Sequence, residues 1–213
     1  MERAVGRSIR WLIAGLVGTP LLLALPTPHG STLWILFHLT VLVAYGLVLT
    51  MALVEELDTP WFSGLSPQAS LFGSAVSLVV LATGAVALVT LASSAALRLD
   101  PSMQFLQLLS ALDIAWVAGA TAIGARLAAG RIAGWAAGGM IVVVCVWSVA
   151  TYLNAVGYTP AGGWLVDGDA MWRYILPYDM AAAVIAITTL TFGVRRRSGA
   201  DARQAMAQPS RQS

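Results

Sequence analysis

Lysine is absent from this sequence of 213 residues, and charged residues of all kinds make up only 10% of it. Without a lysine amine the chain cannot form a Schiff base with retinal, which excludes a rhodopsin-type pigment. Soluble domains contain about 25% charged residues, so these few charges cannot cover a surface that faces water. The composition therefore excludes a soluble enzyme, a nucleic-acid-binding domain and a disordered tail protein.

Cysteine and histidine are also scarce, with one cysteine, Cys145, and two histidines, His29 and His38. A single cysteine can form neither an internal disulfide nor a thiolate metal site. Two histidines provide almost no material for binding a metal ion or a haem. No glycine-rich loop is present to bind the phosphates of ATP. The sequence therefore predicts no cofactor.

Hydrophobic residues are what the sequence has in quantity, at 58% of the chain with a mean hydropathy of +0.79. A transmembrane helix needs about 20 mainly apolar residues, and six segments approach or exceed that length. They predict an all-α fold: a polytopic bundle of six transmembrane helices that forms a single domain over residues 1–197. The predicted spans are residues 11–25, 33–54, 70–97, 103–125, 132–156 and 172–194. The first is short, and we interpret it as an uncleaved first helix.

The arginines predict how this bundle is oriented in the membrane. With both termini in the cytoplasm, ten of the twelve arginines fall on the cytoplasmic side, and only Arg98 and Arg173 fall outside. This distribution agrees with the positive-inside rule and indicates an N-in and C-in topology. The arginine-only, alanine-rich usage is typical of a GC-rich bacterium, so we predict a multi-pass protein of the bacterial cytoplasmic (inner) membrane. The polar residues 198–213 are predicted to form a disordered cytoplasmic tail.

Asp113 is the most informative polar residue, because it lies near the middle of the fourth predicted span. An ionised aspartate there costs about 2.5–3.5 kcal/mol on insertion scales, so such a residue usually faces the bundle interior or a wet cavity. Helical periodicity places Ser110 and Trp116 on the same face. Thr151 and Asn154 of the fifth span are candidate hydrogen-bond partners. The functional interpretation is a proton or cation site, and the alternative is a protonated carboxyl group that joins two helices.

Asp179 is a second candidate site residue, at the start of the sixth span. If that helix begins at Trp172, Asp179 is buried below the membrane interface. If the helix begins at Pro177, Asp179 lies in the first turn, where the helix dipole favours an acidic residue. We favour the second interpretation, and Arg173 is then a candidate ion-pair partner. Elsewhere, Gly134 and Gly138 are spaced for close helix packing in a membrane.

Two hypotheses for function follow. The first is a membrane subunit that binds or transports a small solute, proton or cation through Asp113, with Ser110, Thr151, Asn154 and Asp179 as further binding residues. The alternative is a structural, assembly or accessory subunit of a membrane complex without catalytic activity. An intramembrane enzyme is the least favoured class, because no nucleophile–base set and no protease motif is visible. The predicted partners are the lipid bilayer and either another membrane subunit or a second copy of this chain, with no nucleic acid.

Overall fold

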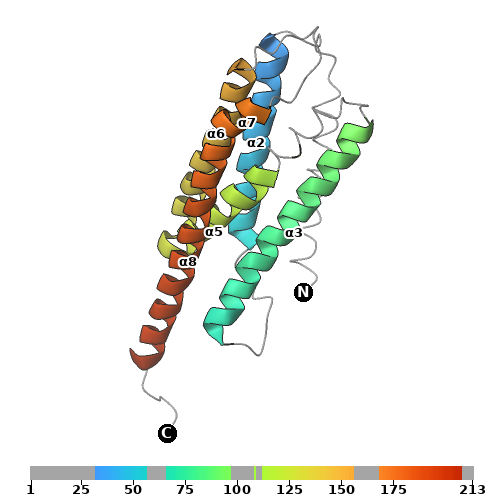
Figure 1. The fold of residues 1–213 in the computed structure, drawn as a ribbon. Helices are drawn as coiled ribbons and strands as arrows, with labels where there is room; N and C mark the ends of the chain where they lie inside the picture. The colour runs from blue at the N-terminus through green and yellow to red at the C-terminus, as the bar shows by residue number, and fades with distance from the viewer. Residues whose placement is uncertain (1–31, 57–65, 97–107, 109–111, 156–167, 208–213) are drawn as a thin grey trace.

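The structure, a computed structural model, describes residues 32–56, 66–96, 108, 112–155 and 168–207. All elements within these residues are helices (Figure 1). They are α2 (Thr32–Glu56), α3 (Pro67–Ala96), the π-helical turn η1 (Ile114–Ala118), α5 (Gly119–Ala129), α6 (Arg131–Ala155), α7 (Gly168–Tyr174) and α8 (Leu176–Ala207).

Three of these helices are long and apolar enough to cross a membrane. The qualifying segments are Ala69–Leu88 of α3, Arg131–Tyr152 of α6 and Leu176–Arg203 of α8. Two shorter apolar segments, Gly46–Glu55 and Ile114–Ala129, accompany them. The all-α prediction is thus confirmed for the described residues, whereas the first predicted span, 11–25, lies outside them.

The observed bounds follow the apolar runs closely in three cases. The predicted spans 33–54, 70–97 and 132–156 correspond to α2, α3 and α6, and each end differs by no more than three residues. Of the fourth predicted span, 103–125, the structure describes Leu108 and the residues from Leu112 onward. The helix of this span continues to Ala129.

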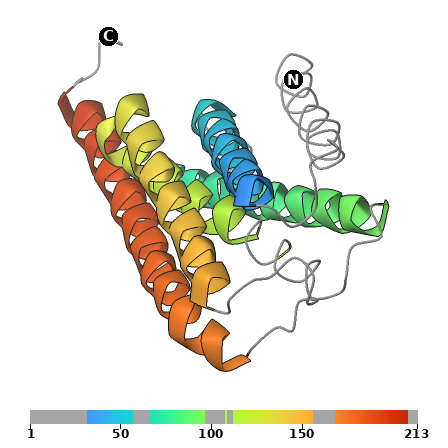
Figure 2. The same cartoon turned by 90° about the horizontal axis from the view of Figure 1, so that it is seen from above.

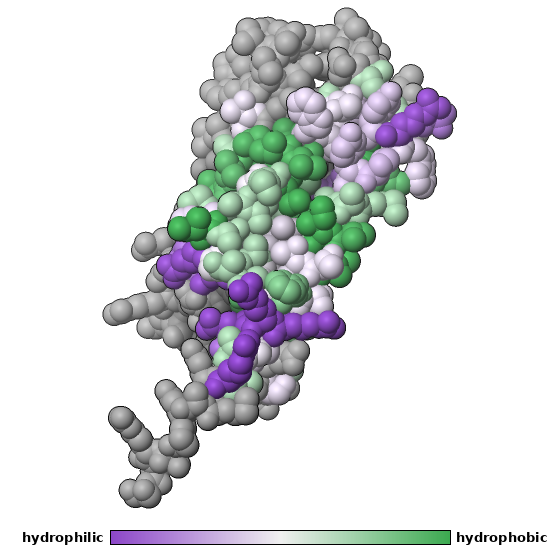
Figure 3. All heavy atoms as spheres, turned by 90° about the vertical axis from the view of Figure 1, so that its left-hand side faces the viewer, coloured by the Kyte–Doolittle hydropathy of each residue, from purple (hydrophilic) through white to green (hydrophobic). Residues whose placement is uncertain are grey.

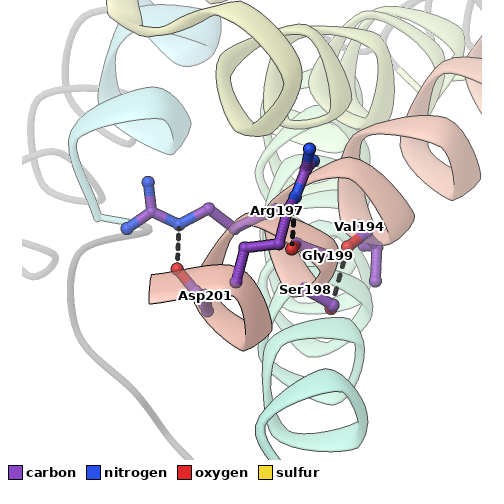
Figure 4. A network of polar contacts seen from close by, with 6 residues as sticks. Val194, Arg197, Ser198, Gly199 and Asp201 are labelled. Carbon is purple, nitrogen blue, oxygen red and sulfur yellow. Dashed lines mark hydrogen bonds and ion pairs between the residues drawn. The ribbon is translucent and has the colours of Figure 1, made fainter. Parts of the chain in front are cut away.

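The sixth predicted span, 172–194, differs from the structure at both ends. The chain forms the short helix α7, turns at Ile175 and then forms α8, which continues without interruption to Ala207. Residues 198–207 are therefore helical rather than part of a disordered tail. This extension carries its own local bonds, because Arg197 pairs with Asp201 at 3.4 Å and Ser198 donates its hydroxyl to the carbonyl of Val194 at 2.9 Å (Figure 4).

The bundle is organised around η1 and α5, which pack against α2, α3, α6 and α8. The helices α6 and α8 lie side by side in both views of the ribbon, and α3 crosses the bundle so that its start lies against α8 and its end points away from it (Figures 1 and 2). The core between them is apolar. Its fully or almost fully buried members include Ile114, Val117, Ala118, Ile123, Val142 and Ala186.

Glycines allow the helices of this core to approach very closely. A methyl group at Gly124 of α5 would lie 2.5 Å from backbone atoms of Thr189 in α8, and one at Gly193 would overlap the carbonyl oxygen of Gly124. Gly134 and Gly138 of α6 likewise face α5, where a methyl group at Gly138 would lie 2.8 Å from the Cβ of Ala122. Their predicted role in close helix packing is confirmed.

Candidate functional site

Asp113 lies at the point where the α-helical backbone changes to the π-helical turn η1. Its backbone is helical, with φ −61° and ψ −45°, and its side chain does not cap the turn. The carboxyl group instead accepts a hydrogen bond from the indole N–H of Trp116. Trp116 was predicted to share a face with Asp113, and this contact agrees with that prediction. Single π-helical turns within α-helices are frequent at functional sites.

Asp179 lies in the first turn of α8. The helix begins at Leu176, and the backbone N–H of Asp179 donates to the carbonyl of Ile175 at 3.1 Å. Pro177 occupies the first turn as well, where its missing N–H removes no helical hydrogen bond. The interpretation of Asp179 as a helix-start residue is confirmed, with the start at Leu176 instead of Pro177.

The structure brings these two acidic residues together from separate helices. The side chains of Asp113 and Asp179 are hydrogen-bonded to each other. An ionised carboxylate can only accept hydrogen bonds, so a bond between two carboxyl groups requires a proton on one of them. Two carboxyl groups in contact share a proton in this way because two like charges at such a distance repel strongly. We call Asp113 and Asp179 the carboxyl pair.

The surroundings of the carboxyl pair are largely apolar. Both side chains are half-buried, and Ile114 and Ala182, next to them along the chain, are buried in the main core. Cys145 of α6 lies within electrostatic reach of both carboxyl groups. Among the described residues, no ion pair joins Arg173 to Asp179, and Arg173 is exposed. No arginine of the described segments therefore neutralises the pair.

Three other buried polar residues of the bundle, Thr50, Thr121 and Ser148, behave differently. The hydroxyls of Thr50, Thr121 and Ser148 donate to carbonyls of their own helices at 2.7–2.9 Å. Such bonds satisfy a hydroxyl locally and leave it without a role between helices. The carboxyl pair is distinguished from them because its hydrogen bond joins two helices and carries an exchangeable proton.

Of the remaining predicted site residues, Thr151 is the one whose side chain lies in the described part of the chain. Thr151 donates its hydroxyl to the carbonyl of Trp147 at 2.8 Å, so it follows the same local pattern. Asn154 lies in the last turns of α6, but its side chain lies outside the described part of the chain, as does Ser110. The predicted partner role of Thr151 is replaced by Asp179 and Trp116.

The residues on the two sides of the carboxyl pair differ in exposure. Pro177 and Tyr178, next to Asp179, are exposed where α8 begins. In the opposite direction, Val117, Ala118 and Ile123 follow Asp113 along the chain with no exposed surface. Beyond them Gly124 contacts Gly193 backbone to backbone. Two neighbouring carboxyl groups of this kind can hold and release a proton, or bind a small cation with both groups.

No protein-family model, curated protein or solved structure matches this chain. Within the described residues, no group of three or more histidine, cysteine, aspartate or glutamate side chains is arranged to hold a metal ion. The functional argument therefore depends on the carboxyl pair and its position in the bundle.

Proposed function

We propose that this chain is a six-helix protein of a bacterial cytoplasmic membrane, with both termini in the cytoplasm, that binds a proton or a small cation at the carboxyl pair. The observation that carries the proposal is the hydrogen bond between Asp113 and Asp179. Two carboxyl groups in contact inside a membrane can hold a proton between them. When that proton is released, both groups can coordinate a cation. Intramembrane carboxylates with such partners mark proton and ion pathways.

The distribution of charge supports the proposed orientation. Gly124 lies two residues before Arg126 and contacts Gly193, which lies two residues before Arg195, so these arginines share one end of the bundle. Arg131 is at that end too, where it pairs with Glu55 at 3.6 Å. Figure 3 shows hydrophilic residues gathered near the end of α8, with hydrophobic surface across the middle of the molecule. An arginine-rich end is the cytoplasmic end under the positive-inside rule.

The length of α8 supports a position of the carboxyl pair within the proposed membrane span. Sixteen residues separate Asp179 from Arg195, which is about 24 Å of helix at 1.5 Å per residue. The hydrocarbon core of a bilayer is about 30 Å thick. With Arg195 at the cytoplasmic boundary, Asp179 lies inside the hydrocarbon, close to the outer boundary. We therefore propose that the proton or cation enters from outside.

The proposal is tested by infrared spectroscopy of the protein reconstituted in oriented proteoliposomes. The carbonyl band of a protonated carboxyl group is measured for the wild type, Asp113→Asn and the matched control Asp201→Asn, which removes an acidic residue elsewhere on α8. We expect the band in the wild type and the control, and its loss in Asp113→Asn. Raising the external pH, or adding NaCl or KCl outside, should weaken the wild-type band. A wild-type band that responds to neither treatment from either side would show that the pair only joins helices.

A second candidate function is an accessory or assembly subunit, and the extension of α8 favours it. Residues 195–207 continue as a helix past the apolar part of α8, with Arg195, Arg196, Arg197 and Arg203 exposed. A charged helix that projects from the cytoplasmic end could contact a partner subunit. Native mass spectrometry of gently extracted protein separates the two functions. A second polypeptide at fixed stoichiometry supports the accessory subunit, and a protein that is always found alone contradicts it.

A further inference from the structure

A groove runs between the start of α3 and the cytoplasmic half of α8. It is an open groove on the side of the bundle, and its lining comes from both helices. The lining residues are Ser66, Ala69, Phe72, Thr191, Val194 and Arg195. The charged group lies at one end of it, because Arg195 and Ser66 lie one turn nearer to the arginine-rich end than Thr191 and Ala69.

The cationic group of this groove is the side chain of Arg195. Within the described part of the chain Arg195 forms no ion pair, whereas the nearby Arg197 is paired with Asp201 at 3.4 Å (Figure 4). No acidic residue is among the described residues that line the groove. At the start of α3, Ser66 accepts hydrogen bonds from the N–H groups of Ala69 at 3.3 Å and Ser70 at 2.9 Å. The groove therefore offers one exposed positive charge to an anion.

The rest of the lining is suited to a hydrocarbon chain. Phe72 is 46% exposed, which is a large apolar surface left uncovered by other helices. Ala69 and Val194 add apolar atoms beside it, and the hydroxyl of Thr191 is satisfied by the carbonyl of Ile187 at 2.7 Å. In the proposed membrane orientation, the charged end of the groove lies at the level of the lipid headgroups and the apolar end lies among acyl chains.

We propose that this groove is a binding site for one anionic phospholipid of the cytoplasmic leaflet. The phosphate group of the lipid binds the guanidinium of Arg195, and its acyl chain packs against Phe72 and Ala69. Arginine suits this role because its planar guanidinium can donate two hydrogen bonds to one phosphate. This inference depends on the proposed membrane span but not on the carboxyl pair.

The first test counts the lipids retained by the protein in native mass spectrometry. The protein is reconstituted in nanodiscs that contain one part phosphatidylglycerol to four parts phosphatidylethanolamine. We compare the wild type with Arg195→Gln and with the matched control Arg196→Gln, which removes the same charge from the adjacent position. One basic residue near an anionic surface changes lipid affinity about fivefold. We therefore expect Arg195→Gln to bind phosphatidylglycerol about fivefold more weakly than the wild type, and Arg196→Gln to bind it as the wild type does.

A second pair of variants tests the groove without changing any charge. Ala69→Trp fills the groove, and Val80→Trp places the same side chain on an exposed part of α3 away from it. We expect Ala69→Trp to lose the bound lipid and Val80→Trp to keep it. The site would be overturned, in favour of a diffuse charge effect, if Arg195→Gln and Arg196→Gln retained equal amounts of phosphatidylglycerol. It would also be overturned if Ala69→Trp still retained the lipid. Failure of the wild type to enter a bilayer would instead overturn the membrane span.

Discussion

Two positions along α8 contact the segment from Asp113 to Ala129 in opposite ways. At the beginning of α8, Asp179 forms a hydrogen bond to Asp113 through two side chains. Fourteen residues later, Gly193 contacts Gly124 backbone to backbone, with no room for a single methyl group. The first contact depends on a proton, and the second depends only on shape. The contact at Asp179 can therefore change with protonation, whereas the contact at Gly193 stays closely packed.

The two contacts also differ in how easily they can open. Side chains can move apart at the carboxyl pair without breaking a backbone contact. At Gly124 and Gly193, separation of the helices would lose the van der Waals packing of two backbones that are in direct contact. We infer that α5 and α8 separate less easily at Gly124 and Gly193 than at the carboxyl pair.

The largest effect is expected from closing the space at the glycine contact. In Gly193→Val, the new side chain overlaps the backbone of Gly124, so α5 and α8 must separate. We expect a loss of about 3 kcal/mol in the free energy of unfolding, typical of severe overpacking. Unfolding in mixed micelles, followed by tryptophan fluorescence, measures it. The matched control is Gly199→Val on the same helix, where an added methyl group meets no atom within 4 Å. Equal losses in both variants would show that the contact is not tightly packed.

An intermediate effect is expected from removing one member of the carboxyl pair. Asp113→Leu leaves Asp179 without its partner and leaves the indole N–H of Trp116 without an acceptor. An unsatisfied buried polar group costs about 1–3 kcal/mol, so we expect the free energy of unfolding of Asp113→Leu to fall by an amount in that range. Asp113→Asn retains an acceptor for Trp116 and a donor for Asp179, and its loss should stay below about 1 kcal/mol. Unfolding in mixed micelles measures both variants. Equal stability of Asp113→Leu and Asp113→Asn would contradict a hydrogen bond between Asp113 and Asp179.

Much of the fold could be predicted from the sequence, because long apolar runs between charged ends determine where helices form in a membrane. The bounds of α2, α3 and α6 follow from this. The pairing of Asp113 with Asp179 could not be predicted, because single helices do not reveal which faces meet. The π-helical turn at Ile114–Ala118 has no signal in its apolar sequence. The end of α8 was mispredicted because polarity was taken as disorder, although alanine, arginine and glutamine favour helix.

A smaller effect is expected from pH. The shared proton is bound by the folded protein and is lost as pH rises, after which two negative charges are in contact. As long as the folded state keeps this proton and the unfolded state has lost its own, the folded state binds more protons. The free energy of unfolding therefore falls as pH rises through this range, by at most about 1.4 kcal/mol per pH unit for one proton. Thermal unfolding of the wild type across neutral and alkaline pH measures this slope. In the double variant Asp113→Asn, Asp179→Asn, the stability should depend less on pH. An unchanged slope would show that the titrating group is elsewhere in the protein.

The smallest effect is expected at the ion pair between Glu55 and Arg131, which joins the end of α2 to the start of α6. Their side chains are 37% and 54% exposed, and their atoms are 3.6 Å apart. Water screens exposed pairs of this kind, and their contribution is about 0.5 kcal/mol or less. Glu55→Gln should therefore barely change the unfolding midpoint, and high salt should remove the difference. A loss as large as that of Asp113→Leu would mean that charge, and not the glycine contact, holds the arginine-rich end together. The contrast between the two ends of the bundle would then have a different physical basis.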